Sequence, residues 1–297
     1  MNKNWMLTFS VAILAISITA CGAAQQNNNA QLNQTTNSSE NNKTESPISQ
    51  EPSPAVLYTA DEGGSITKID AASNQVLQII QVEGAVHNVQ VSPDGKWVGA
   101  TVVPSMSDME GMSETGDQEG EHGEDGEHEK NGYAYFYDTA TDELMKKVEV
   151  GAHPAHIEFT MDGNLVLITN NEGNNVSVLD AKTFQMKGTI PTGKSPHGFR
   201  GSADSKLAYV ANMGDDTVSV LNLQMMSEER KIKVGSTPVT TGITSDGKTL
   251  VVPLNAENAV AIVDLATEEV IKVPVGTGPA QVYISSDKKN DCCESRY

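Results

Sequence analysis

The sequence is poor in cysteine, in aromatic residues and in positive charge. It has three cysteines in 297 residues, and two of them, Cys292 and Cys293, are adjacent. Adjacent cysteines do not bridge each other easily, so no disulfide framework is predicted. Lysine and arginine together number 20 against 39 acidic residues, which gives a net charge of −19. This lack of positive charge excludes the basic face that a nucleic-acid partner requires.

Several motifs of common enzymes and cofactor proteins are also missing. The sequence has no CxxCH for covalent haem, no glycine-rich phosphate loop next to a helix and no GxSxG nucleophile elbow. Its two tryptophans, Trp5 and Trp97, are too few to build an aromatic cage around a cofactor. The sequence leaves open whether the protein is an enzyme, and it favours a binding role over catalysis.

The N-terminal part of the chain, up to Pro54, predicts export and a tether. Residues 1–20 have Lys3 before an apolar run that is too short to span a bilayer, which is typical of a signal peptide. The ending ITAC resembles the bacterial lipobox, and this implies that Cys21 carries a lipid; a plain secretion signal is the alternative. Residues 21–54 are rich in Asn, Gln, Ser and Thr and predict a disordered tether. We therefore expect an extracytoplasmic protein that is anchored to the bacterial cell membrane through lipid.

A regular repeat organises the rest of the chain. Glycines in VGxxP-like turns recur at nearly equal intervals, and so do the polar residues that close an alternating run. A period of roughly 40–45 residues that carries four short strands is typical of a β-propeller blade. The glycines are Gly151, Gly193, Gly235 and Gly276, and the polar residues are Asp138, Asp180, Asn222 and Asp264.

One repeat illustrates the four predicted strands. They are expected at residues 197–202, 206–212, 217–222 and 229–234, where apolar and polar residues alternate. Asp-Gly pairs in other repeats supply the positive φ that a tight hairpin needs between the first two strands. No long helical period appears, so the sequence predicts an all-β domain over residues 55–287.

These repeats resemble a known family. YVAN at 209–212, SPDGK at 92–96 and the VGxxP turns resemble the YVTN family of β-propeller repeats. The resemblance implies four-stranded blades, usually seven in number. It implies little about function, because propellers serve as binding platforms, enzymes and scaffolds alike. Some relatives of this family are lactonases or carry redox cofactors.

The repeats in this chain supply about five blades. Four are complete, and the leading strands at 55–82 could pair with a last innermost strand at 280–285 and close a five-bladed ring. The sequence favours a truncated C-terminus over this closure, since the chain departs from the repeat pattern after Asp287. Residues 288–297 are expected to form an irregular tail.

One interval between repeats is too long. Asp94 and Asp162 mark equivalent turns, yet their separation exceeds one blade repeat by about 26 residues. The excess matches residues 105–131, an acidic segment rich in methionine and histidine, which we call the insertion. It joins the second and third strands of a blade. Because blade strands alternate in direction, we expect it to emerge at the end where the innermost strand begins.

The insertion carries potential metal ligands. Three methionines at every third position align on one side of an extended coil with three residues per turn. Thioethers suit Cu(I), whereas imidazoles suit Cu(II) or Zn(II). The alternative is a solvated acidic loop without a ligand. The predicted copper or zinc ligands are Met106, Met109, Met112, His122 and His128.

Four further histidines are predicted at the same face. His87 and His197 share one position at the start of the innermost strand, His156 occupies the next position and His153 lies just before it. They could border the central channel as additional metal ligands, or each could fill an ordinary turn. We therefore expect an envelope-anchored propeller that binds copper or zinc. The alternatives are a metal-free scaffold for an envelope protein and a propeller enzyme with its site on this face.

Overall fold

The computed structural model describes residues 55–104 and 131–285, together with the backbone of 292–295, all within the compact unit Pro52–Tyr297. Within these residues the regular structure is β-strand, apart from one short 3-10 turn, η2 (Asn255–Glu257). The predicted all-β fold is confirmed. No helix in this part of the chain is long and apolar enough to cross a membrane.

Four sheets have four antiparallel strands each, and their order follows the chain. The first contains β4 (Ala85–Val91), β5 (Trp97–Val103), β6 (Asn131–Asp138) and β7 (Leu144–Ala152). The second contains β8 (Pro154–Phe159), β9 (Leu165–Asn170), β10 (Asn175–Asp180) and β11 (Met186–Pro191). The third contains β12 (Pro196–Gly201), β13 (Leu207–Asn212), β14 (Thr217–Asn222) and β15 (Ser227–Lys233). The fourth contains β16 (Gly242–Ile243), β17 (Thr249–Leu254), β18 (Ala259–Asp264) and β19 (Val270–Pro274).

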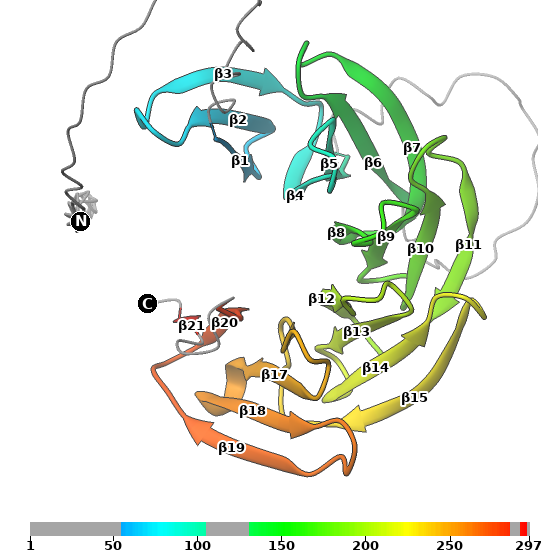
Figure 1. Cartoon of the computed structure of the whole chain (residues 1–297), viewed down its shortest axis with the longest axis vertical. Helices are drawn as coiled ribbons and strands as arrows, with labels where there is room; N and C mark the ends of the chain where they lie inside the picture. The colour runs from blue at the N-terminus through cyan, green and yellow to red at the C-terminus, as the bar shows by residue number, and fades with distance from the viewer. Residues whose placement is uncertain (1–54, 105–130, 286–291, 296–297) are drawn as a thin grey trace, which may run out of the picture. The chain divides into compact units, whose positions relative to one another are not determined.

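These sheets follow one another as propeller blades around a common centre (Figure 1). The first strands of successive sheets are in contact, because β4 lies against β8, β8 against β12 and β12 against β16. The first strand of each blade is therefore the innermost one, as the repeat predicted. The fourth strand lies at the outside, and its side chains are mostly exposed.

In the described part of the chain, the two ends of the series do not form the ring closure that the repeats would have allowed. The three leading strands, β1 (Val56–Asp61), β2 (Ser65–Asp70) and β3 (Val76–Gln81), form a sheet of their own. The last innermost strand, β20 (Pro279–Tyr283), pairs with β21 (Cys292–Ser295). The possible pairing of 280–285 with the leading strands is therefore not observed among the described residues, and the tail that was expected to be irregular contains a strand.

Apolar side chains between adjacent blades form the core. The second strand of a blade is buried on both faces because a neighbouring blade packs on each side, so Val166, Leu167 and Ile168 in β9 are all buried. Between the first two complete blades, the rings of Phe136 and Phe184 stack with their centroids 4.0 Å apart. Each such buried side chain contributes about 1.5–3 kcal/mol to folding.

The repeated polar residue at the end of the third strand closes a turn in every blade. Its side-chain oxygen accepts hydrogen bonds from the backbone N–H groups two and three residues later, at 2.7–3.0 Å. These backbone hydrogen bonds lower the pKa of the four aspartates in this position. The five residues are Asp70, Asp138, Asp180, Asn222 and Asp264.

The structure shows where the insertion leaves and rejoins the blade. Val103, at the end of β5, pairs with Ala85 at the start of β4, and Asn131, which opens β6, pairs with Ala152. Both junctions therefore lie at the end of the blade where the innermost strand begins, which confirms the predicted topology. Residues 105–130 themselves lie outside the described part of the chain.

Candidate metal centre

Each of three consecutive innermost strands contains one extra residue relative to its partner strand. The register shifts between Val86 and Asn88 in β4, between Pro154 and Ile157 in β8, and between Pro196 and Phe199 in β12. Such a β-bulge bends the strand and re-aims a side chain. His87, His156 and His197 lie within these three bulges. The repeat thus places three histidines at similar irregular positions in adjacent blades.

Two buried threonines connect the bulges to one another. The hydroxyl of Thr101 accepts the N–H of Asn88 at 3.0 Å and donates to the carbonyl of Ala155 at 2.8 Å. The hydroxyl of Thr169 does the same one blade further on. It accepts the N–H of His156 at 2.9 Å and donates to the carbonyl of His197 at 2.7 Å. A hydroxyl has one donor and two acceptor positions, so these bonds are compatible. They hold the three strands in a defined spacing.

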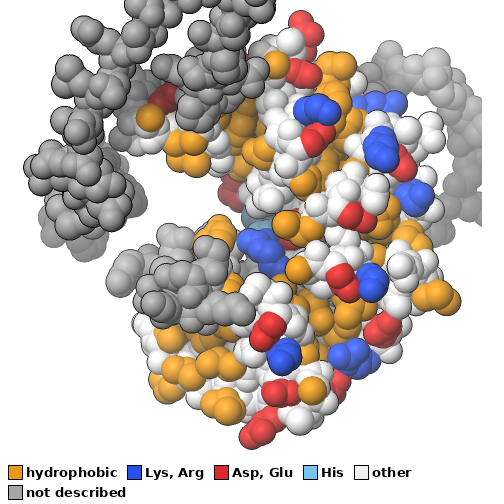
Figure 2. Space-filling view, viewed as in Figure 1, with side chains coloured by type: hydrophobic (Ala, Val, Ile, Leu, Met, Phe, Trp, Pro, Cys, Tyr) orange, Lys and Arg blue, Asp and Glu red, His pale blue; other side chains and the backbone are white. Residues whose placement is uncertain are grey.

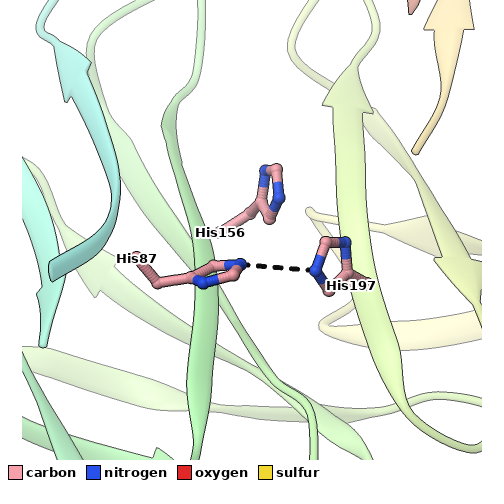
Figure 3. A group of neighbouring side chains, drawn as sticks. All are labelled: His87, His156 and His197. Carbon is pink, nitrogen blue, oxygen red and sulfur yellow. Dashed lines mark hydrogen bonds between the residues drawn. The ribbon is translucent and has the colours of Figure 1, made fainter. Parts of the chain in front are cut away.

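The three imidazole rings converge (Figure 3). Nε2 of His87 is 3.3 Å from Nε2 of His197, and one ring nitrogen from each of the three residues lies within 4.8 Å of the others. The ring of His156 is centred 5.8 Å from that of His87 and 4.7 Å from that of His197. We call these residues the histidine trio. Figure 2 shows histidine in the hollow between the sheets, beside a basic side chain.

Hydrogen-bond acceptors behind two of the rings define their orientation. Nδ1 of His87 is 3.0 Å from Oε1 of Glu62, and Nδ1 of His197 is 3.0 Å from the carbonyl oxygen of Val239. A carboxylate and a carbonyl only accept, so Nδ1 carries the proton in both rings. In a neutral imidazole this leaves a lone pair on Nε2. Metal-bound histidines are held in this same way by a carboxylate or carbonyl behind the ring.

When both rings are neutral, two Nε2 lone pairs face each other at 3.3 Å. This arrangement is unfavourable unless a cation lies between them, either a shared proton or a metal ion. Two imidazoles bound to one tetrahedral zinc ion at 2.0–2.1 Å have their nitrogens about 3.3 Å apart. The separation between His87 and His197 is thus compatible with two ligands of one metal ion of this size.

His156 is the buried member of the trio, with 7% of its surface exposed. Burial lowers its pKa well below the usual value of 6.5, and the neighbouring His197, His87 and Arg200 lower the pKa further. The ring is therefore neutral at physiological pH. A neutral ring keeps a lone pair for a metal ion, and it offers no charge of its own to separate His87 from His197.

The structure separates His153 from the other predicted histidines. Its backbone has a φ of 50°, and its Nδ1 lies 3.2 Å from Oε1 of Glu172, with about half of the side chain exposed. It does not belong to the trio. The remaining predicted residues lie outside the described part of the chain, namely Cys21, Met106, Met109, Met112, His122 and His128.

Sequence reasoning missed the groups that support the trio. Glu62 lies in the turn between β1 and β2, and the carbonyl of Val239 is a backbone group, so neither follows from the repeat pattern. Arg200 could have been singled out by aligning the repeats, because the equivalent positions of the other innermost strands carry no basic residue.

The chain matches a protein family and resembles solved structures in fold. The choice-of-anchor I domain family matches residues 48–282. No curated protein matches the chain. Hydrazine synthase from Kuenenia stuttgartiensis resembles it with a TM-score of 0.56 and 25% identity, over 69% of this chain and 53% of that one. A functionally unknown protein from Desulfotomaculum acetoxidans gives a TM-score of 0.55 and 16% identity, over 73% of this chain and 64% of its own. The chain thus spans about half of the hydrazine synthase chain.

Proposed function

The chain belongs to the choice-of-anchor I domain family, whose members lie at the cell surface or elsewhere outside the cytoplasm, and we propose that this β-propeller binds a transition-metal ion. The ligands are His87, His156 and His197. Neutral imidazole suits Cu(II) and Zn(II), so copper or zinc is the expected ion. Three protein ligands leave a fourth position open to water or to another ligand.

The observation that carries this proposal is the pair of opposed Nε2 atoms. Their protons are fixed on the far side of each ring by Glu62 and by the carbonyl of Val239. A shared proton would relieve the opposition of two lone pairs, but it would not use the third imidazole. A metal ion uses all three, and the neutral His156 is already in the required state.

The insertion is the second element of the proposal. We expect Met106, Met109 and Met112 to bind Cu(I), and His122 and His128 to bind Cu(II) or Zn(II), near the face where the trio lies. The support is the sequence of the insertion and the position of its two junctions, Val103 and Asn131. The insertion would capture an ion and the trio would hold it.

Attachment to the membrane is the third element. The finer family assignment, a YVTN-type repeat protein, and the lipid on Cys21 rest on the sequence motifs alone. We expect Cys21→Ala to release the protein from the membrane fraction. Intact mass of the membrane-bound form would test this directly, because acylation adds the mass of its fatty chains.

Metal titration of purified variants tests the trio. We expect His197→Ala and His87→Ala to weaken zinc or copper binding by more than about 100-fold, since loss of an outer hydrogen-bond partner alone costs 10- to 100-fold. His153→Ala is the matched control, because His153 is an exposed histidine directly before β8 that does not face the trio. Calorimetry would give the affinities, and the thermal midpoint would rise with metal in the wild type and the control only.

Deletion of residues 105–130 separates the two metal-binding elements. The deletion variant should retain the trio's ion and lose additional copper equivalents. Weak uptake that is equal in the wild type and in the His87→Ala and His197→Ala variants would overturn the trio. Uptake that is unchanged by the deletion would overturn the role of the insertion.

A further inference from the structure

The innermost strands carry an acid–base pair beside the histidine trio. Glu158 follows His156 by two residues on β8, and Arg200 follows His197 by three residues on β12. At about 3.3 Å per residue, their backbones lie about 7–10 Å along the strands from those of the histidines. The guanidinium of Arg200 is near enough to His156 for its charge to contribute to the lowered pKa of that ring. The pair thus lies on two of the three innermost strands that carry the trio.

The contacts of Arg200 occupy one side of its guanidinium. Nη1 donates to the carbonyl of Phe199 at 2.9 Å and lies 3.5 Å from Oε2 of Glu158. The guanidinium carbon is 5.8 Å from the centre of the Tyr283 ring. Among the described residues, neither Nε nor Nη2 of Arg200 makes a hydrogen bond. The guanidinium therefore has donors to offer to a ligand.

The carboxylate of Glu158 makes only a long contact with the guanidinium of Arg200. Its Oε1 accepts the N–H of Gly201 at 3.1 Å, whereas its buried Oε2 has no hydrogen-bond partner in the described structure. The 3.5 Å separation from Nη1 is longer than a strong charge-assisted hydrogen bond. The pair is thus held in place by the backbone of β12 more than by mutual contact.

A cavity of about 290 Å³ adjoins this pair. Glu158, Arg200, Thr244, Ser245 and Tyr283 supply its polar side chains. The volume is at the lower limit for small-molecule sites, which suits a small anion better than a polymer segment. Hydroxyl groups beside a guanidinium are typical partners of carboxylate and phosphate oxygens.

Charge balance indicates the sign of the ligand. A divalent ion held by three neutral imidazoles brings two positive charges close to the positive guanidinium of Arg200. Glu158 supplies one negative charge here, and Glu62 is largely exposed on the far side of His87. An excess of positive charge in a partly buried site is stabilised by an anion.

We propose that the fourth position at the metal takes a small carboxylate or oxyanion, which Arg200 holds by a second oxygen. This inference rests on the proposed function, because the metal supplies one of the two anchors. Arginine offers parallel N–H donors that match a carboxylate or phosphate, and the metal ion supplies a Lewis-acid position for the same anion. The site would therefore bind a small anionic ligand only when metal is present.

Cobalt-loaded protein provides the test, because the visible absorption of bound Co(II) depends on its ligands. The spectrum therefore changes when an anion binds to the metal, and it disappears when the metal is lost. Acetate, malonate and inorganic phosphate are titrated separately into wild type, Arg200→Met and Arg200→Lys. We expect at least one of the three anions to perturb the Co(II) spectrum of the wild type. Its affinity should fall at least about 10-fold in Arg200→Met and by less in Arg200→Lys, which keeps the charge without the fork.

Arg230→Met is the matched control, because Arg230 is a similarly exposed arginine that binds Glu268 on the outside of the blades. The affinity for cobalt itself should be unchanged or higher in Arg200→Met, since a positive charge has been removed. If cobalt does not bind the wild type, the proposed function fails. If cobalt binds but no anion perturbs its spectrum, or Arg200→Met binds the anion as tightly as the wild type, this inference fails and the metal site stands.

Discussion

The turns that follow the third strand of each blade, here called the outer turns, and the bulges of the innermost strands, here called the inner bulges, both belong to the repeat. They differ in where their polar groups find hydrogen-bond partners. At the outer turns, Asp180 and its equivalents accept hydrogen bonds from the backbone of their own turn, two and three residues away. At the inner bulges, the side chains contact residues far away in the sequence. His87, for example, lies 110 residues before His197.

This difference separates positions that maintain the fold from positions that are available for function. Every turn position carries Asp or Asn because each turn has the same local requirement. The bulge positions vary, and the fourth blade has Val239 and Thr240 where the preceding blades carry histidine. In a protein of repeated units, a site is therefore to be sought where the repeats differ and where their polar groups converge between units.

The largest expected effect on metal affinity comes from His156, the buried histidine of the bulges. His156→Leu should weaken metal binding by more than about 100-fold, because one of the three ligands is lost. The free energy of unfolding of the metal-free protein should change by about 1 kcal/mol or less, since an apolar residue of similar size replaces a buried neutral ring. Metal titration and urea denaturation measure the two quantities. A large loss of stability without loss of affinity would show that His156 maintains the fold and is not a metal ligand.

A substitution that affects both properties is Thr169→Val. It leaves the N–H of His156 and the carbonyl of His197 without their buried partner, which should lower the free energy of unfolding by about 1–3 kcal/mol. Because the spacing of two bulges depends on this hydroxyl, metal affinity should fall as well. Thr183→Val, at an exposed outer turn, is the control and should leave metal affinity unchanged. Equal affinity in Thr169→Val and the control would show that the threonine does not position the trio.

A smaller effect is expected behind His87. Glu62→Gln replaces the carboxylate that orients the ring with a neutral amide, and metal affinity should fall by about 10-fold. The side chain of Glu62 is 73% exposed, so the free energy of unfolding should be unchanged. Calorimetric titration with zinc gives the affinity. An unaltered affinity would mean that the contact of Glu62 with His87 does not contribute to metal binding.

The smallest effect should appear at the outer turns, and only in acid. The lowered pKa values of the turn aspartates mean that their stabilisation is present above the ordinary carboxyl pKa of about 4 and is lost as the pH falls through the folded-state values. Replacing the four turn aspartates together by asparagine should therefore make the loss of stability below pH 4 shallower. Asparagine keeps the hydrogen bonds, as Asn222 shows. The four aspartates are Asp70, Asp138, Asp180 and Asp264.

Urea midpoints at pH 7 and pH 3 would measure this change. Asn222→Asp is the reverse control, because it adds one titrating turn and should steepen the dependence. Metal affinity at neutral pH should be the same in both variants. A turn substitution that altered metal binding would contradict the separation of the two regions.

The period of the repeat was sufficient to predict much of the fold. The strand boundaries in the third complete blade were within two residues of β12 to β15, and the junctions of the insertion were placed at the correct end of the blade. These features follow from local alternation and from the fixed up-and-down order of blade strands. The end of the series was not predictable in the same way, because pairing of β20 with β21 depends on a segment without the repeat pattern.

The candidate site was predictable only in part. The alignment of repeats brought four histidines to one face but could not separate His153 from the other three, because the positive φ of His153 just before β8 and its contact with Glu172 are not visible in the repeat pattern. Glu62 and Arg200 acquire their roles from contacts between elements that are distant in the chain. Alternation along a strand carries no information about such contacts.

The sequence by itself determined the blades, since a recurring local pattern of strands and aspartate turns needs no information from elsewhere in the chain. Only the tertiary structure decided which histidines meet, how their protons are placed and which charge lies beside them. The physical reason is that a bulge directs its side chain toward the centre of the blades, where its neighbours come from other repeats.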